Sequence, residues 1–425
     1  MFSLAVLSFF LILGIPLVFA IIMSMTLYLG ETPISISLIG QRIFGGLDSF
    51  SILAIPLFVL AGELMNKSGI TNRIITFANS LVGAFRGGLA QVNVWSSVMF
   101  AGLSGSAVAD TSALGRVFIP EMEKEGYSRE FSSALTAASS VIGPMIPPSI
   151  PVIIYALIAS GVSVPALFLA GIVPGVLSAV CLSVFVYIYA SRNKNIKCNT
   201  AKQSLKERFN AFISAIVPLT MPVFIIGAIL MGIVTPTEAA AFAAFYALII
   251  GMFIFRTLKI KDLPEVFITS MRDSSIVLIL IAVVSVANWL LTFSQVPQMI
   301  SQQVLDNITN PIVFLLLVNL ILLAVGLFLE GIAAMLILIP ILHPIAMSFG
   351  IDPVHFGVIV IFNLMIGLIT PPMGMCLFVA NTISKVGIAA ISRQVIPLFL
   401  LEVLVLMFIT FVPSSVLMLP RLFGY

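Results

Sequence analysis

The chain has 425 residues, of which 60% are hydrophobic and 9% charged, and its formal net charge is +3. A soluble domain carries roughly 25% charged residues, so this composition excludes an ordinary soluble protein and predicts an all-α polytopic membrane protein. The cations lie mainly in short loops, which gives no indication of a nucleic-acid partner.

The N-terminal region contains two predicted membrane spans. Residues 4–29 are apolar but lack a basic start and a clear cleavage site, so we interpret them as a span rather than a cleaved signal peptide. The polar residues that follow, including Arg42, are interpreted as a loop, and residues 50–66 as a second span. The more polar stretch that continues to Arg86 favours a helix in the membrane interface.

Two interrupted segments come next. Residues 91–120 predict a re-entrant hairpin, because the Gly- and Ser-rich run Gly102–Asp110 divides them near the middle. Residues 130–160 predict a crossing broken at 143–149, since Gly costs about 1 kcal/mol and Pro about 3 kcal/mol in a helix interior. Broken backbone at membrane depth must be buried in protein or face a water-filled site, because lipid offers it no hydrogen bonds.

The middle of the chain carries the strongest charge signal. After a span over residues 166–190, residues 191–210 form a basic loop whose one acidic residue is Glu207. Such an excess of cations predicts a cytoplasmic loop, where thiols such as that of Cys198 stay reduced. The cations are Arg192, Lys194, Lys197, Lys202, Lys206 and Arg208.

The second half repeats this order of elements. Two linking spans, 211–233 and 235–256, return the chain to a further basic loop. The hairpin of this half is interrupted at Gly326–Gly331 and its broken crossing at Gly367–Gly374. The outward span covers residues 274–294 and leads to a periplasmic stretch, 295–310, that contains no Lys or Arg. The hairpin follows at 311–348, the broken crossing at 354–384 and a last span at 395–418.

The two halves align as an internal repeat. Gly105 aligns with Gly331, and Gly143 aligns with Gly367 at nearly the same offset along the chain. Cations flank the first hairpin but not the second, so the hairpins are predicted to enter from opposite sides, as inverted repeats, with their breaks meeting near the midplane. Three units are predicted: a first inverted repeat over residues 1–190, a cytoplasmic basic loop over 191–210, and a linking span with the second inverted repeat over 211–425.

The breaks place candidate ligands at membrane depth. A half-helix N-terminus suits a carboxylate, whereas the exposed carbonyls of a half-helix C-terminus suit a cation. Hydroxyls beside the breaks add hard oxygen ligands that match an alkali cation. These hydroxyls belong to Ser104, Ser106, Ser149 and Thr370. Small residues also line helix contacts in membranes, so packing is the alternative for each of them.

Several polar side chains near membrane depth remain open to two interpretations. Asp110 and Glu330 lie close to the hairpin breaks, where each is a candidate for attracting a cation or fixing a hairpin tip. Asp110 is also a candidate N-cap of the second half-helix. Glu238 is interpreted as a structural residue in a first helical turn. Asn363 either lines the site or forms an interhelical hydrogen bond.

One enzymatic alternative follows from a short motif. Gly102-Leu103-Ser104-Gly105 matches the G-x-S-G of rhomboid-type intramembrane serine proteases, which would need a histidine base on a neighbouring helix. The two histidines, His343 and His355, form no zinc-binding spacing with the cysteines, so we expect no metal other than an alkali ion. A protease using Ser104 would leave the inverted repeat without a role, and we expect no enzyme.

Four stretches of the chain, Leu47–Met65, Gly105–Asp110, Asp352–Gly357 and Ile366–Gly374, carry a resemblance to a known family. Together they resemble the large membrane subunit of a tripartite ATP-independent periplasmic (TRAP) transporter. It implies a sodium symporter of the ion-transporter superfamily that works by an elevator mechanism. The chain has Glu330 where such proteins usually have Asp.

The resemblance also implies the binding residues. Sodium would be the coupling ion, and no other cofactor is expected. Its sites would lie around Ser104, Ser106, Gly143, Ile146 and Pro148 in the first half and Gly326, Gly331, Thr370 and Met373 in the second. The substrate would lie between these sites, near Ser104, Ser106, Ser149 and Asn363.

The implied setting is the inner membrane of a bacterium, with two partners. These partners are a small four-helix membrane subunit and a periplasmic substrate-binding protein. The implied substrate is a small organic acid of the C4-dicarboxylate or sialic acid class. A stand-alone sodium/carboxylate carrier of the same superfamily, which needs no binding protein, is the alternative.

Overall fold

The computed structural model describes residues 6, 9–10, 13–30, 35–159, 161–193, 196 and 204–425, apart from the side chains of Leu103 and Ser104. The start of the first predicted span, most of residues 194–203 and Cys198 therefore lie outside the described residues. The described chain is helical and contains seven helices long and apolar enough to span a membrane, or eight if one bent pair counts as a span. The predicted all-α polytopic fold is confirmed.

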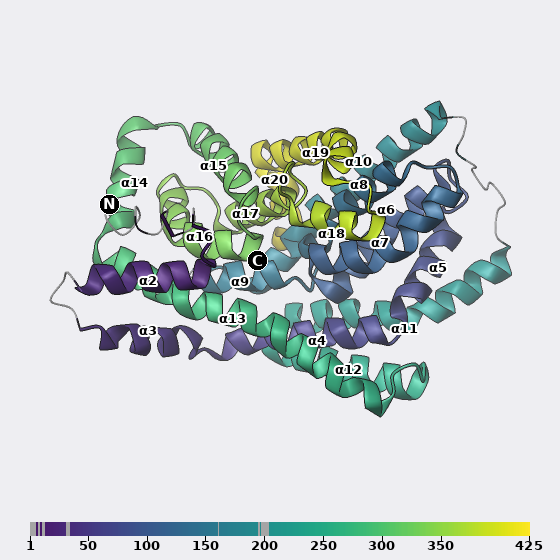
Figure 1. The fold of residues 1–425 in the computed structure, drawn as a ribbon, viewed down its shortest axis with the longest axis horizontal. Coiled ribbons are helices and arrows are strands. Elements are labelled where there is room, and N and C mark those ends of the chain that lie inside the picture. The colour runs from purple at the N-terminus through teal and green to yellow at the C-terminus, as the bar shows by residue number, and fades with distance from the viewer. Residues whose placement is uncertain are drawn as a thin grey trace.

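One side of the molecule, which we call the scaffold layer, is built from long helices of the N-terminal and linking regions (Figure 1). Within it, α4 packs along α12 and α3 packs along α13. The scaffold layer comprises α2 (Leu17–Gly30), α3 (Ser37–Leu47), α4 (Ala54–Lys67), α11 (Leu205–Leu230), α12 (Pro236–Ile249) and α13 (Leu263–Phe293).

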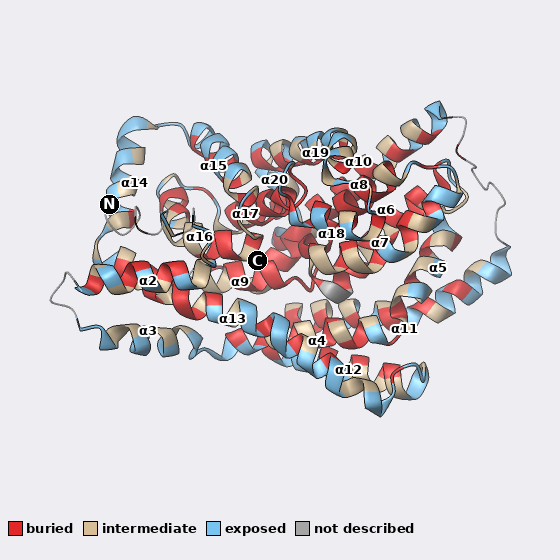
Figure 2. Ribbon diagram, in the orientation of Figure 1, coloured by how far each residue is buried: buried red, intermediate tan, exposed pale blue. Residues whose placement is uncertain are grey.

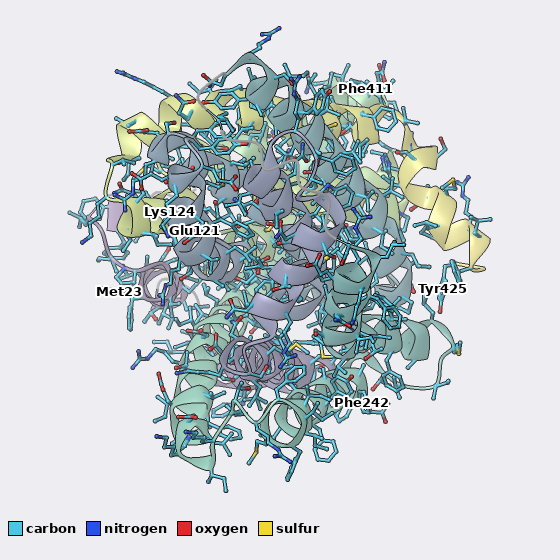
Figure 3. The ribbon with its side chains drawn as sticks, turned by 90° about the vertical axis from the view of Figure 1, so that its right-hand side faces the viewer. Met23, Glu121, Lys124, Phe242, Phe411 and Tyr425 are labelled. Carbon is cyan, nitrogen blue, oxygen red and sulfur yellow. The ribbon has the colours of Figure 1, made fainter. Side chains whose placement is uncertain are left out.

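Most of the remaining helices form a second layer, which we call the core layer because its helices hold most of the buried residues (Figure 2). Viewed end on, Phe242 of the scaffold layer and Phe411 of the core layer lie on opposite sides of the molecule (Figure 3). The core layer comprises α6 (Gly88–Ser104), α7 (Ala107–Lys124), α8 (Arg129–Ser140), α9 (Ile150–Ile158), α10 (Val164–Arg192), α15 (Pro311–Gly326), α16 (Gly331–Ser348), α17 (Pro353–Gly367), α18 (Met375–Ser384), α19 (Ile388–Phe411) and α20 (Pro413–Leu422).

Two short arms join the layers at opposite ends of the molecule: α5 (Ile70–Val82) and α14 (Val296–Asn307) (Figure 1). Each arm follows a scaffold helix after a residue in the left-handed backbone region, Gly69 at φ 71° before α5 and Gln295 at φ 54° before α14. The arms contact the core layer through α6 and α16, respectively. The two halves thus turn from scaffold to core in the same way.

The core layer repeats one motif twice. In each half, a hairpin (α6–α7 or α15–α16) packs on a broken helix (α8–α9 or α17–α18). The peptide bonds Pro147–Pro148 and Pro371–Pro372 within the breaks are both cis. The two hairpins lie toward opposite ends of the molecule (Figure 1), as expected for inverted repeats that enter the membrane from opposite sides.

Three details differ from the predicted elements. The expected loop around Arg42 is helix α3, because its polar groups pair with α13: Ser285 Oγ donates to Arg42 O at 2.7 Å, and the guanidinium lies 5.0 Å from the Trp289 ring centre. The outward span begins earlier, at Leu263. The last span divides into α19 and α20 at Pro413, which has no backbone N–H to continue the helix.

Candidate functional site

The first hairpin tip joins a helix C-terminus to a helix N-terminus. Gly105 follows α6 at φ 59°, a conformation that suits glycine, and the chain then enters α7. The N-cap of α7 is Ser106, whose hydroxyl accepts a hydrogen bond from Ala109 N at 3.4 Å. The prediction of Asp110 as N-cap is therefore wrong; Asp110 lies in the first turn and is fully buried.

This tip lies directly against the first helix break. A Cβ built on Gly105 would lie 3.0 Å from Pro148 O, and a Cβ on Gly143 would overlap Asp110 Oδ2. Ser149 caps α9 by accepting from Val152 N at 3.3 Å, and its hydroxyl donates to Pro144 O. Tip and break therefore form one compact site.

The second tip has the same construction with a different cap. Glu330 caps α16, and its Oε2 accepts from Ile332 N at 3.0 Å and from Ala333 N at 3.1 Å. The tip lies so close to the second break that a Cβ on Gly367 would come within 2.8 Å of Gly326 Cα. Glu330 thus fixes the hairpin tip, one of the two roles considered for it.

The first tip also reaches the broken helix of the other repeat. The thiol of Cys376 on α18 lies against Thr111 and within electrostatic range of Asp110 on α7. A Cβ on Gly115 would lie 3.0 Å from the Ile383 side chain, so α7 and α18 pack closely over their length. The two predicted half-sites therefore adjoin each other.

Carboxylates are distributed unevenly over the four helix N-termini of this region. The hairpin helices α7 and α16 carry Asp110 and Glu330, respectively, at their N-terminal ends. The broken-helix segments α9 and α18 have no acidic residue in their first turns. A helix N-terminus carries about half a positive charge. The hairpin ends are therefore compensated, whereas the ends of α9 and α18 remain able to attract an anion.

The structure places the other predicted residues as follows. Asn363 Nδ2 donates to Asn319 O at 3.0 Å and to Asn319 Oδ1 at 2.9 Å, which is the interhelical arrangement considered for it. Thr370 Oγ1 donates to Ile366 O at 2.9 Å beside the second break.

The two predicted apolar residues differ in their surroundings. Ile146 packs on Gly175 of α10, whereas Met373 is about half exposed at 49%. The side chain of Ser104 lies outside the described side chains.

Other polar residues singled out in the sequence lie away from the breaks. Glu238 forms a capping box with Thr235 at the start of α12, which confirms its structural interpretation. His343 Nδ1 lies 3.1 Å from Tyr155 Oη, and His355 Nε2 lies 2.8 Å from Ile409 O. Both imidazoles are therefore engaged at positions other than the tip that holds Ser104.

Sequence reasoning missed a further buried carboxylate, Glu402. It lies on α19 and accepts from Ser178 Oγ at 2.6 Å. The signal was present, because Glu402 is a single carboxylate inside an apolar span and intramembrane carboxylates are rare.

Inverted halves whose hairpin tips meet broken helices define a secondary transporter. The family model described as "Tripartite ATP-independent periplasmic transporter, DctM component" matches residues 1–415, and the chain belongs to this family of TRAP transporter large permease subunits.

Individual relatives agree with this assignment. The chain is 42% identical to the sialic acid TRAP transporter large permease protein SiaM of Vibrio cholerae over 414 residues, which cover 97% of this chain and 96% of the relative. It is 35% identical over 406 residues to the C4-dicarboxylate TRAP transporter large permease protein DctM of Rhodobacter capsulatus, covering 92% of each chain. The YdaH transporter of Alcanivorax borkumensis shares the fold, with a TM-score of 0.64 over 88% of this chain and 87% of that one at 15% identity.

Membership in this family decides one of the open alternatives and the location of the protein. The relatives are transporter permeases, so the protein is not an enzyme and the intramembrane protease interpretation is excluded. With its apolar spans, the protein is a multi-pass protein of the bacterial inner membrane.

Proposed function

We propose that this protein is the permease subunit of a sodium-driven TRAP system that imports a small organic acid by an elevator mechanism. The observation that carries the proposal is the uneven charge of the four helix ends. Asp110 and Glu330 supply negative charge at the hairpin tips, whereas α9 and α18 present N-termini without acidic residues. Such a site suits cations at the tips and a carboxylate at the broken helices.

The proposed sodium sites combine these carboxylates with exposed backbone and hydroxyl oxygens. The first lies between the α6–α7 tip and the break at Gly143, where Asp110 already touches the backbone. The second lies between the α15–α16 tip and the break at Gly367, beside Thr370. Alkali cations favour such hard oxygen ligands. We place the substrate carboxylate between them, at the N-terminus of α9 with Ser149.

The substrate class is proposed from the relatives. Their names include sialic acid in Vibrio cholerae, C4-dicarboxylate in Rhodobacter capsulatus and 2,3-diketo-L-gulonate in Escherichia coli. These compounds share a carboxylate on a small polar skeleton. We therefore propose a carboxylate of the sialic acid or C4-dicarboxylate class for this chain.

The proposed partners are a small membrane subunit and a periplasmic binding protein. The chain covers only 64% of the isethionate TRAP transporter permease protein DctMQ of Oleidesulfovibrio alaskensis and 66% of the sialic acid TRAP transporter permease protein SiaT of Haemophilus influenzae. The additional length of these two relatives supports the proposal of a second membrane subunit that works with this chain.

The elevator proposal rests on the two layers. The core layer holds both tips and both breaks, so its movement against the scaffold layer would carry the whole site. One contact between the layers is suited to a test, because a Cβ on Gly102 of α6 would lie 2.9 Å from Pro222 Cβ of α11. Disulfide formation needs Cβ atoms roughly 3.5–4.5 Å apart, which a small adjustment provides.

A cross-link at this contact tests the mechanism. The pair Gly102→Cys with Pro222→Cys, once oxidised, should abolish uptake, and a reductant should restore it. The pair Gly46→Cys with Ser285→Cys joins two scaffold helices and should leave uptake intact; the wild type under the same oxidation controls for its own cysteines. Full uptake by the oxidised 102–222 pair would contradict the elevator mechanism.

Reconstitution tests the driving ion and the partners. Proteoliposomes containing the chain with both proposed partners should take up a labelled acid under an inward sodium gradient and not under a potassium or choline gradient. Each partner is omitted in turn, and uptake by this chain alone would favour the stand-alone carrier. Cation binding can be tested without transport by measuring the melting temperature in sodium and in potassium. Sodium should raise it more than potassium does, and the double variant Ser104→Ala with Thr370→Ala should lose this difference.

A further inference from the structure

Glu402 is a buried carboxyl group that the proposed transport cycle does not use. Its residue is 1% exposed on α19, and its Oε1 accepts from Ser178 Oγ of α10 at 2.6 Å. Its Oε2 is also buried and has no hydrogen-bond partner among the described residues. The group therefore has one neutral hydroxyl where an ionised carboxylate ordinarily has several donors.

The surroundings of Glu402 provide no compensating charge. From α10, the titratable group that faces it is the thiol of Cys181. From the other helices packed on α19, which are α8, α17, α18 and α20, no charged side chain within the described residues interacts with the Glu402 carboxyl. An isolated charge in such an interior is strongly unfavourable unless it is paired.

The position of the pair in the repeat adds a second argument. Ser178 and Glu402 are separated along the chain by the same offset that relates Gly143 to Gly367. The two residues are thus repeat mates that contact each other, so they lie where the inverted halves cross. Ser178 is one turn beyond Gly175, whose Cα packs against Ile146 in the first break. The pair therefore lies about one helical turn from the contact between α10 and the first break.

We propose that Glu402 is a proton-binding site, which holds one proton as a neutral carboxylic acid at the crossing of α10 and α19. The neutral acid accepts the hydrogen bond from the Ser178 hydroxyl at Oε1 and leaves no charge in the core layer. Loss of the proton would place an unpaired carboxylate between the two helices. This site is separate from the proposed sodium and substrate sites, and the proposal does not depend on them.

Infrared spectroscopy tests the proposal directly, because a protonated carboxylic acid has a C=O stretching band that an ionised carboxylate lacks. The purified wild type at neutral pH should show one such band that Glu402→Gln removes. Ser178→Ala deletes the hydrogen bond to the carboxyl, so the band should remain and move to higher wavenumber. Identical spectra of the wild type and Glu402→Gln in this region would overturn the proposal.

The pH dependence of heat stability gives an independent readout. A carboxyl that is protonated when folded and ionised when unfolded makes stability fall as pH rises above the ordinary Glu range, by up to about tenfold in the folding equilibrium per pH unit. The melting temperature of the wild type should therefore fall relative to that of Glu402→Gln between about pH 5 and pH 8. Parallel melting curves over this range would contradict a bound proton.

Discussion

Asn363 and Asn319 are paired through two hydrogen bonds between α17 and α15, and Asn319 Nδ2 also donates to Thr410 Oγ1 of α19 at 3.0 Å. The first repeat has a counterpart, because Asn93 aligns with Asn319 at the offset that relates Gly105 to Gly331. Asn93 Nδ2 donates to Thr136 Oγ1 of α8 at 2.7 Å. Each hairpin is thus tied to the broken helix of its own repeat by a buried asparagine. This pairing stabilises the packing of each hairpin on its broken helix.

Removal of this pairing should lower stability. Asn319→Ala removes the side-chain bonds to Asn363 and Thr410 and keeps only the bond from Asn363 Nδ2 to the backbone carbonyl of residue 319. Buried polar pairs in membranes contribute about 1–2 kcal/mol. We expect a melting temperature lower by several degrees in detergent. Asn307→Ala is the matched control, because the Asn307 side chain donates to Gln303 O within the exposed arm α14. This variant should melt as the wild type does. Equal melting of both variants would contradict a structural role for the asparagine pair.

Close backbone packing at the second tip should not tolerate a methyl group. Gly367→Ala would bring its Cβ to 2.8 Å from Gly326 Cα, and overpacking costs about 1–3 kcal/mol. We expect the variant to lose stability by this amount and its uptake to fall, because the tip and the break must move apart to fit the methyl group. Gly227→Ala, in a helix with no atom within 4 Å of its Cβ, should retain uptake. Uptake is measured per reconstituted protein, and wild-type activity of Gly367→Ala would refute the argument.

The charge of Glu330 should matter more than its capping role. Glu330→Gln keeps an oxygen that can accept from Ile332 N and Ala333 N, so the helix cap is retained while the charge is lost. We expect the sodium concentration for half-maximal stabilisation to rise by about tenfold, equivalent to about 1.4 kcal/mol. Glu330→Asp should stay near the wild type. Unchanged sodium dependence in the Gln variant would remove Glu330 from the proposed cation site.

Two serine caps distinguish substrate binding from helix capping. Ser149 caps α9 at the proposed substrate site, and Ser163 caps α10 by accepting from Ala166 N at 3.3 Å. Each Ala variant should lose about 1 kcal/mol of stability. The KM for the substrate should rise in Ser149→Ala only, at unchanged sodium dependence. A similar KM in both variants would place the substrate elsewhere.

The base of the first hairpin should respond to pH through Glu125. Burial raises the pKa of this carboxyl above its ordinary value, although a hydrogen bond from Leu89 N acts in the opposite direction. Because the folded state then binds the proton more tightly, stability falls as pH rises above the ordinary Glu range. Glu125→Gln should therefore melt higher than the wild type at neutral pH and equally at low pH. Asp306→Asn, an exposed carboxylate change, should alter neither curve.

The sequence was informative where the membrane limits the possible structures. Helix-breaking Gly and Pro at membrane depth, recurring at nearly one offset between the halves, predicted the tips and breaks of both repeats. Of the roles left open for Asp110, that of the N-cap of α7 was wrong, because both Ser106 and Asp110 suit an N-cap and only the backbone path selects Ser106. Helix α3 was missed because its polar residues resemble a loop until α13 supplies their partners.

Contacts between distant segments could not be predicted in the same way. Asn363 has a suitable side chain for a ligand or for an interhelical bond, and the decision rests on Asn319, which lies on a different helix. The pairing of Glu402 with Ser178 joins residues from the two halves of the chain and follows from the crossing of α10 with α19. Tertiary packing, rather than local pattern, determines such roles.

The contact of Gly102 with the Pro222 ring joins the two layers without a side-chain hydrogen bond. Neither residue has a side-chain hydrogen-bond group, and the ring of Pro222 lacks the flexible tail that would interlock with a neighbouring helix. Sliding at this point breaks no side-chain hydrogen bond and displaces no long side chain. If the layers move as proposed, this contact would therefore be lost without breaking a side-chain hydrogen bond.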